Sequence, residues 1–245
     1  MELLGIDIGG SGIKGGMVDL ETGLLTRDRH KIPTPQPATP KAVAGVVVKV
    51  VEHFEWEGPI GCTLPTVVRQ GVVHSAANID KSWIGVDGER LLRKATGQKV
   101  ALLNDADAAG IAEMRFGAGR DRGGVVFILT FGTGIGSGVF VDGHLHPNTE
   151  LGHLEFKGMD AEQYAAARVR ELEKLTYKAW GTRVNEFLQH LENIFSPDLF
   201  VIGGGVSRKI GKFKAYLVLD TEVVPAQLRN EAGIVGAALT ARDRL

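Results

Sequence analysis

Two glycine-rich turns carry the first candidate chemistry in this sequence. One spans Asp7–Lys14 and the other Thr130–Ser137, and apolar runs flank both. In such a turn several backbone N–H groups point to one place without side chains in the way, which suits an anion and above all a phosphate. The candidate phosphate ligands are Gly9, Gly10, Ser11, Gly12, Lys14, Gly132, Thr133 and Gly134. An aspartate follows each turn at the same spacing, so we expect a duplicated fold that holds a phosphate between its halves.

Asp7 ends the apolar run before the first turn. Its carboxylate can cap its own turn, which is a frequent role of aspartate. It can also lie near a Mg²⁺ ion that accompanies a transferred phosphate. We favour the metal site, because the turn recurs with Thr133, whose hydroxyl can also reach a phosphate. Lys14 is either a solvated strand residue or a further phosphate ligand.

Asn104 and Asp105 stand between an apolar run and an alanine-rich segment. A helix N-cap belongs at such a place and needs only one of the two residues. The end of a strand is also where α/β proteins build catalytic sites. A carboxylate there, next to an amide that orients a hydroxyl, would be a general base for an alcohol nucleophile. In isolation, capping is the simpler interpretation.

Glu150 and His153 form a third candidate group. Carboxylates that accept hydrogen bonds from vicinal hydroxyls are what a sugar pocket requires, although a solvated loop with a structural histidine would have the same sequence. Asn78 and Asp80 are candidates to join such a pocket. Trp83 would then be either its apolar wall or ordinary core.

A glycine triplet, Gly203, Gly204 and Gly205, follows another apolar run. It is either a tight turn alone or a place where a nucleotide or phosphate chain approaches the backbone closely. Basic residues near this turn or the sugar loop are either a solvated face or ligands of a donor chain. They are Lys81, Lys178, Arg183, Arg208, Lys209, Lys212 and Lys214.

Composition limits the classes of function. A chain of 245 residues with 44% hydrophobic residues fits one large or two modest domains with real cores. Its net charge of −1 argues against a whole-molecule field for nucleic acid or anionic membrane. The single cysteine, Cys62, excludes an internal disulfide and a cysteine-rich zinc site. No basic leader region or membrane-length apolar run is present, so we expect a soluble, cytoplasmic protein.

Hydrophobic patterns and turn signals predict the elements that position these groups. Predicted strands cover residues 3–8, 13–18, 24–32, 60–64, 100–103, 125–130, 135–141 and 200–202. Predicted helical segments cover residues 39–54, 106–116, 161–195 and 230–240. In the first of these, Thr39 is the candidate N-cap and Pro40 the first helical residue.

Together these segments resemble the ROK family of sugar kinases (repressors, open reading frames and kinases), and within it the polyphosphate glucokinases. The matching motifs are the two phosphate turns, the catalytic segment at 104–108, the E-x-G-H element at 150–153 and the closing helix at 232–237. The segments 33–40, 75–85 and 130–137 resemble the polyphosphate-using branch in particular.

The resemblance implies an α/β protein with the actin-like (ribonuclease H-like) duplicated ATPase fold, in which two lobes flank an active-site cleft. We expect a smaller lobe at 1–106, joined by the C-terminal helix 232–245, and a larger lobe at 107–231. Asp105 is the implied base, and Glu162 takes the place of the family's next sugar-binding glutamate. The implied sugar ligands are Asn78, Asn104, Asp105, Glu150, His153 and Glu162. Because the family's zinc cysteines are missing after His153, no zinc is expected.

The expected reaction is transfer of a phosphoryl group from polyphosphate, with ATP as a candidate second donor, to the 6-hydroxyl of glucose. Mg²⁺ near Asp7 would neutralise charge on the transferred group, and closure of the lobes would exclude water. One alternative is a strictly ATP-dependent kinase for glucose, mannose or fructose. Another is a non-catalytic sugar-sensing regulator, against which the retained Asp105 and the lack of a DNA-binding segment before Leu3 both argue. A homodimer is implied by the resemblance alone.

Overall fold

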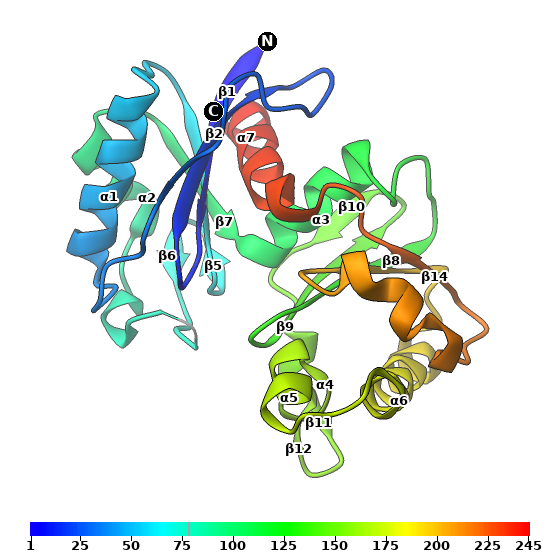
Figure 1. The fold of residues 1–245 in the computed structure, drawn as a ribbon. Coiled ribbons are helices and arrows are strands. Elements are labelled where there is room, and N and C mark those ends of the chain that lie inside the picture. Colours follow the sequence, from blue (N-terminus) through cyan, green and yellow to red (C-terminus); the bar gives the residue numbers. More distant parts are fainter. Residues whose placement is uncertain (78) are drawn as a thin grey trace. The chain divides into compact units, whose positions relative to one another are not determined.

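The computed structural model describes residues 1–77 and 79–245. It divides into two compact units, shown in Figure 1: Met1–Ala112 together with Glu231–Leu245, and Glu113–Asn230. Asn78, a predicted sugar ligand, lies outside the described residues. Across the described part of the chain, no helix is both long and apolar enough to span a membrane.

The first unit is built on a sheet with strand order β3-β2-β1-β4-β7. Its strands are β1 (Glu2–Ile8), β2 (Ile13–Asp19), β3 (His30–Ile32), β4 (Ile60–Leu64) and β7 (Val100–Asn104), and a small separate hairpin joins β5 (Val68–Arg69) to β6 (Val72–Val73). β1 pairs antiparallel with β2 and parallel with β4, which pairs parallel with β7. The predicted strand at 24–32 is wrong in length, because only its last three residues pair with β2 as a strand.

Helices cover the two faces of this sheet (Figure 1): α7 on one face, and α1 and α2 on the other. They are α1 (Pro40–His53), α2 (Gly88–Thr96) and α7 (Ala232–Arg244), while α3 (Asp105–Phe116) follows β7 directly. α7 packs very close to the strands, since a Cβ on Gly5 would overlap the Ile234 carbonyl and one on Gly61 the Ala237 carbonyl. The terminal helix therefore depends on glycines in the strands beneath it.

The start of α1 confirms the predicted capping signals. Thr39 is the N-cap, and its Oγ1 accepts a hydrogen bond of 3.4 Å from the backbone N–H of Ala42. Pro40 occupies the first turn, where its missing N–H has no intrahelical partner to lose. Val43, Val47 and Val50 are fully buried on one face, as the helical spacing requires.

The second unit repeats the topology of the first, with strand order β10-β9-β8-β13-β14. Its strands are β8 (Val125–Phe131), β9 (Ile135–Val141), β10 (His144–His146), β13 (Leu199–Gly203) and β14 (Glu222–Pro225), and a small hairpin joins β11 (Glu155–Phe156) to β12 (Met159–Asp160). Again an antiparallel meander comes first, formed here by β8, β9 and β10. Its first strand, β8, then pairs parallel with β13, which pairs parallel with β14. The predicted duplication is confirmed at the level of topology.

The helical region predicted at 161–195 is interrupted. It consists of α4 (Ala161–Ala165), α5 (Ala167–Leu172) and α6 (Tyr177–Phe195). Ala166 is extended, with φ −59° and ψ 154°, and the buried Trp180 donates from Nε1 to the carbonyls of Ala165 and Ala166. A tertiary contact thus replaces the helical hydrogen bonds there. Short 3₁₀ turns complete the chain: η1 (Lys81–Trp83), η2 (Leu151–His153), η3 (Ser207–Lys212), η4 (Lys214–Tyr216) and η5 (Arg229–Glu231).

Replacing Gly61 with alanine should destabilise the protein, because the new methyl group would overlap the Ala237 carbonyl. Overpacking of this kind costs about 1–3 kcal/mol. Gly45→Ala is the matched control: a Cβ there meets nothing within 4 Å, and removing a mid-helix glycine should stabilise by roughly 0.5–1 kcal/mol. Urea unfolding measures both. Equal stabilities of the two variants would contradict the close approach of α7.

Candidate active site

Asp7 is held at the end of β1 by its neighbours in the sheet. Its Oδ1 accepts a hydrogen bond of 3.0 Å from Thr63 Oγ1, and its Oδ2 lies 2.9 Å from Lys14 Nζ. Both partners follow from register, because Asp7 stands opposite Thr63 in the parallel pair and opposite Lys14 in the antiparallel pair. Lys14 is therefore more than a solvated strand residue, since its ammonium group pairs with Asp7 beside the first glycine-rich turn.

The first glycine-rich turn is closed by a hydrogen bond of 3.1 Å from the Gly9 N–H to the Gly12 carbonyl. Thr34, in the proline-rich loop, donates from Oγ1 to the Gly9 carbonyl at 2.5 Å. Gly10 and Ser11 at its tip are exposed. The proline-rich loop thus braces the turn, and the backbone at its tip is left open to solvent.

Asn104 caps the helix that Asp105 begins. Its Oδ1 accepts hydrogen bonds from the N–H groups of Ala106 (2.8 Å) and Asp107 (3.0 Å), while its Nδ2 donates to the Thr66 carbonyl at 3.1 Å. Asp105 is half-buried, and one carboxylate oxygen accepts a hydrogen bond of 2.9 Å from the Ala106 N–H. Asn104 performs the capping suggested by the sequence, so its direct contact with sugar stays a prediction. The positive end of the helix stabilises negative charge on Asp105.

The second glycine-rich turn is tied to Glu162. The Gly132 N–H donates to the Gly134 carbonyl at 2.9 Å, and the Glu162 carboxylate accepts a hydrogen bond of 3.1 Å from the Ile135 N–H. A Cβ on Gly134 would overlap that carboxylate, so a larger residue there would displace the Glu162 side chain from this position. Glu162, inferred only by resemblance, is thereby placed against a turn predicted to bind phosphate.

Ser137 binds the backbone on both sides of Glu150, through Thr149 before it and Leu151 after it. The Ser137 hydroxyl, which is 1% exposed, donates to the Thr149 carbonyl at 2.7 Å and accepts from the Leu151 N–H at 3.0 Å. Gly152 follows in the same 3₁₀ turn, and a Cβ there would overlap the Ile135 carbonyl. Strand β9 therefore fixes the backbone that carries Glu150 and His153.

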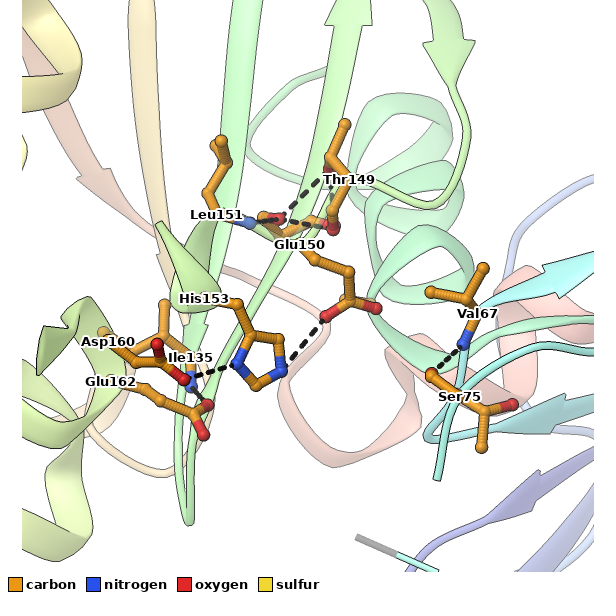
Figure 2. Close-up of polar contacts among 12 residues, drawn as sticks. Val67, Ser75, Ile135, Thr149, Glu150, Leu151, His153, Asp160 and Glu162 are labelled. Atoms are coloured by element: carbon orange, nitrogen blue, oxygen red, sulfur yellow. Dashed lines mark hydrogen bonds and ion pairs between the residues drawn. The ribbon is translucent and has the colours of Figure 1, made fainter. Parts of the chain in front are cut away.

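His153 lies between two carboxylates (Figure 2). Its Nδ1 is 3.1 Å from Asp160 Oδ2, and its Nε2 is 3.8 Å from Glu150 Oε2. Partial burial lowers the pKa of His153, but the hydrogen bond to Asp160 and the charges of Glu162 and Glu150 outweigh it, so its pKa is raised. Burial, with a contribution from Glu162, raises the pKa of Glu150 against the opposing effect of His153. The three predicted sugar ligands of this unit therefore form one electrostatic group.

A pocket of about 440 Å³ lies beside the second turn in the same unit. It is lined by Gly132, Thr133 and Gly205, together with Tyr177 and the basic residues Arg168, Arg170 and Lys209. The glycine triplet thus contributes to an open cavity. Gly204, at φ 77°, also needs to be glycine, because a Cβ would overlap the Phe131 backbone.

The basic residues around this pocket differ from those expected. Of the sequence candidates, Lys209 lines it, and Lys212 Nζ lies 5.2 Å from the centre of the Tyr177 ring. Arg183 instead forms an ion pair of 2.6 Å with Glu173. Sequence reasoning missed Arg168 and Arg170, because the pattern of their segment predicts only a helix. The Arg168 N–H donates a hydrogen bond of 3.0 Å to the Gly132 carbonyl, and this contact brings both charges next to the second turn.

Trp83 belongs to the core. It is fully buried, and its Nε1 donates to the Ala38 carbonyl at 2.9 Å, so the interpretation as an apolar pocket wall is wrong. Asp80 caps the following 3₁₀ turn through the Ser82 N–H at 2.8 Å. Cys62 is buried, which raises the pKa of its thiol. Within residues 1–77 and 79–245, no cluster of three or more His, Cys, Asp or Glu side chains could hold a metal ion.

The duplicated topology and the two glycine-rich turns point to a class of protein, which the solved structures identify. In solved structures, an inorganic polyphosphate/ATP-glucomannokinase from Arthrobacter sp. matches with a TM-score of 0.96 and 49% identity, covering 100% of this chain and 99% of its own. A ROK family glucokinase from Streptomyces griseus, solved with glucose and AMPPNP, matches with a TM-score of 0.83 and 25% identity over 99% and 100% of the two chains. The chain has the actin-like ATPase fold of sugar kinases.

The sequence comparisons give the family. The ROK family model matches residues 3–168. A polyphosphate glucokinase from Mycobacterium tuberculosis is 56% identical over 236 residues, which cover 96% of this chain and 89% of the relative. The chain belongs to the ROK family.

Removal of the Ser137 hydroxyl should loosen the segment that carries Glu150. Ser137→Ala would leave the part-buried Leu151 N–H and Thr149 carbonyl without this partner, and an unsatisfied polar group of this kind costs about 1–3 kcal/mol when it is fully buried. We expect faster hydrogen exchange at the Leu151 amide and a lower free energy of unfolding. Thr182→Ala is the control, because that hydroxyl is exposed and bonds only along its own helix to Lys178. Unchanged exchange at Leu151 would contradict the assignment.

Proposed function

We propose that this chain is a polyphosphate glucokinase, which transfers a phosphoryl group from inorganic polyphosphate to the 6-hydroxyl of glucose. The high identity to a curated polyphosphate glucokinase and the match to a polyphosphate/ATP-glucomannokinase support this function. The structural observation that carries it is the basic pocket beside the second phosphate turn, which offers a long anion several cations. Glucose 6-phosphate and a polyphosphate shortened by one unit are the products.

The acceptor half of the reaction falls to the polar groups described above. Asp105 accepts the proton of the 6-hydroxyl as that oxygen attacks phosphorus, since it stands at a strand end and its helix is already capped by Asn104. Glu150, Glu162 and His153 bind the other hydroxyls, because carboxylates and imidazole are acceptors for vicinal O–H groups. Asn78 and Asn104 remain proposed sugar ligands.

The donor half falls to the two turns and the pocket. Arg168, Arg170 and Lys209 outweigh the single carboxylate of Glu171 among the lining residues, so the pocket is cationic. The Arg170 guanidinium lies 4.3 Å from the centre of the Tyr177 ring. The ring therefore holds a cation beside the pocket, where its charge can contact a bound phosphate chain. Use of ATP as a second donor follows the relative's dual activity.

Mg²⁺ is the proposed cofactor, and Asp7 fits it as a single protein ligand. The carboxylate is part-buried beside a phosphate turn, and Mg²⁺ in phosphoryl-transfer sites is commonly held by one or two carboxylates plus substrate phosphates and water. The ion would neutralise negative charge on the transferred group. Lys14 already pairs with Asp7 and directs a positive charge to the same turn. On the family resemblance alone, we also propose a cytoplasmic homodimer.

Asp105→Asn should abolish most phosphoryl transfer but retain glucose binding. The amide keeps an oxygen for the Ala106 N–H but is no longer a base, so the turnover number should fall by roughly 10²–10⁴-fold. Isothermal calorimetry with glucose tests binding separately. Asp87→Asn is the control, because Asp87 also caps a helix, through the Arg90 N–H at 2.8 Å, and asparagine caps equally well. An Asp105 variant with near-normal turnover would refute the base.

Neutralising the pocket should weaken the donor but not the sugar. Each contact between an exposed cation and the polyphosphate chain is individually weak, so three are removed together. In the triple variant Arg168→Gln, Arg170→Gln and Lys209→Gln, we expect the KM for long polyphosphate to rise by about tenfold. The KM for glucose should stay within a factor of about two, and added salt should shrink the difference from wild type.

The control for charge replaces three exposed cations of the first unit, Arg93, Lys94 and Lys99, by glutamine. Assays with long polyphosphate, short polyphosphate and ATP then compare donors. Equal losses for all donors, or an equal loss in the control, would mean that the pocket does not hold a polyphosphate chain. Wild-type activity with ATP alone would favour the ATP-dependent kinase instead.

A further inference from the structure

Asp160 stands where an aspartate normally caps a helix, yet its side chain is used elsewhere. It is the N-cap residue of α4, with extended backbone angles of φ −63° and ψ 137°, and within the described chain its carboxylate makes no capping hydrogen bond. Aspartate is among the best N-cap residues because its carboxylate can accept the free N–H groups of the first turn. Here Oδ2 contacts Nδ1 of His153 at 3.1 Å instead (Figure 2). Local helix stability therefore does not explain this carboxylate.

The small hairpin before α4 fixes the position of Asp160. β11 and β12 pair Glu155 with Asp160 and Phe156 with Met159. The two residues between them have positive φ, 55° at Lys157 and 79° at Gly158, as a tight hairpin turn requires.

Two side chains attach this hairpin to α6. Phe156 is 9% exposed and packs edge-on against Phe187. Lys157 forms an ion pair with Glu186, which also accepts a hydrogen bond of 2.8 Å from the Tyr164 hydroxyl. The Asp160 carboxylate is thus carried by an anchored element rather than by a loose loop.

We propose that Asp160 is a positioning residue for sugar binding: it holds the Nδ1–H of His153 and thereby presents Nε2 to a sugar hydroxyl. The proposal rests on the proposed function of the site. The neutral imidazole has one N–H, and a carboxylate at Nδ1 selects the tautomer in which Nε2 is the acceptor. Nε2 lies 3.8 Å from Glu150 Oε2, which is too long for a direct hydrogen bond. Both atoms can therefore accept from hydroxyls of one sugar.

The charges around the ring give the Asp160 contact a second measurable signature, the pKa of His153. The acidic groups that face His153 are Asp160, Glu150 and Glu162, and together they favour its protonated form. Loss of the Asp160 charge should lower the pKa of His153 and allow the neutral ring to carry its proton on Nε2 as well as on Nδ1. A residue that merely stabilised the hairpin would change neither property.

The experiment compares Asp160→Asn and Asp160→Glu with wild type. Nitrogen-15 NMR of glucose-free protein follows His153, identified among the seven histidines by the signal missing in His153→Gln. In wild type above its pKa, His153 should carry its proton on Nδ1. In Asp160→Asn the pKa should fall and Nε2-protonated imidazole should appear, and Asp160→Glu should restore much of the wild-type state.

Kinetics provide the second readout. Asp160→Asn should raise the KM for glucose by roughly tenfold or more, which corresponds to loss of a charge-assisted hydrogen bond. The turnover number at saturating glucose and the KM for polyphosphate should change by less than about twofold. The melting temperature should also change little, because the substitution removes no helix cap. Asp220→Asn, an exposed acidic residue of the same unit, controls for net charge.

The outcomes separate the two proposals. An unchanged pKa and tautomer of His153 in Asp160→Asn would overturn the positioning role, whatever the enzyme does. A loss confined to thermal stability, or an equal loss in the KM for both substrates, would overturn it as well. Absence of glucose phosphorylation in wild type would instead refute the proposed function, while the NMR titration would still report whether Asp160 orients His153.

Discussion

The lack of a side chain at Gly134 is the constraint on which the placement of Glu162, and with it the proposed chemistry of the second unit, depends. It lets the Glu162 carboxylate lie against the turn and accept the Ile135 N–H at 3.1 Å. Two residues after Ile135 on the same strand, Ser137 fixes the backbone on both sides of Glu150. The β8–β9 hairpin therefore supports the proposed phosphate turn and the proposed sugar ligands together. A shift in its register would displace both.

Acidic and basic side chains lie in separate groups around the β8–β9 hairpin. Glu150, Glu162 and Asp160 share one histidine, and burial of Glu150 raises its pKa. Such an acidic group repels phosphate but offers many acceptors to a neutral polyol. The pocket beside Gly132 has the opposite character, with arginine and lysine side chains in its lining. Such an arrangement can bind two substrates at separate places at the same time: an anionic donor at the pocket and a neutral, hydroxylated acceptor at the acidic group.

Local signals were enough to predict the parts of the molecule that local physics decides. The β1–β2 and β8–β9 pairs and the capped start of α1 follow from glycine turns, apolar runs and a Thr-Pro cap. The third strand was predicted too long, and the helical region at 161–195 was predicted without breaks. There a buried tryptophan takes up the carbonyls of Ala165 and Ala166, which no helix propensity records.

The proposed site was predictable to a similar degree. Glu150 and His153 lie together, as their short spacing suggests, and Asn104 caps α3, as its position suggests. Arg168, Arg170 and the use of Asp160 were not found, because each depends on contacts made across the fold. The boundaries of the two lobes, the role of Asn78 and the catalytic role of Asp105 stay predictions. Sequence reasoning therefore located the segments better than it assigned the work of each side chain.

The β1–β2 and β8–β9 hairpins share one topology but differ in the side chains beside their turns. Asp19 and Asp142, at matching distances from their turns, both serve the backbone: Asp19 accepts from the Glu21 N–H and Asp142 from the Gly124 N–H. The turn-proximal positions differ, because the first hairpin has the Asp7–Lys14 ion pair and the second has Ser137 where Lys14 would fall. A charged pair suits contact with a phosphate and its metal, whereas a buried hydroxyl suits precise placement of a neighbouring loop. The aspartates that recur in sequence are thus the architectural ones. The residues that differ carry the proposed contact with phosphate and metal in the first hairpin and the placement of Glu150 in the second.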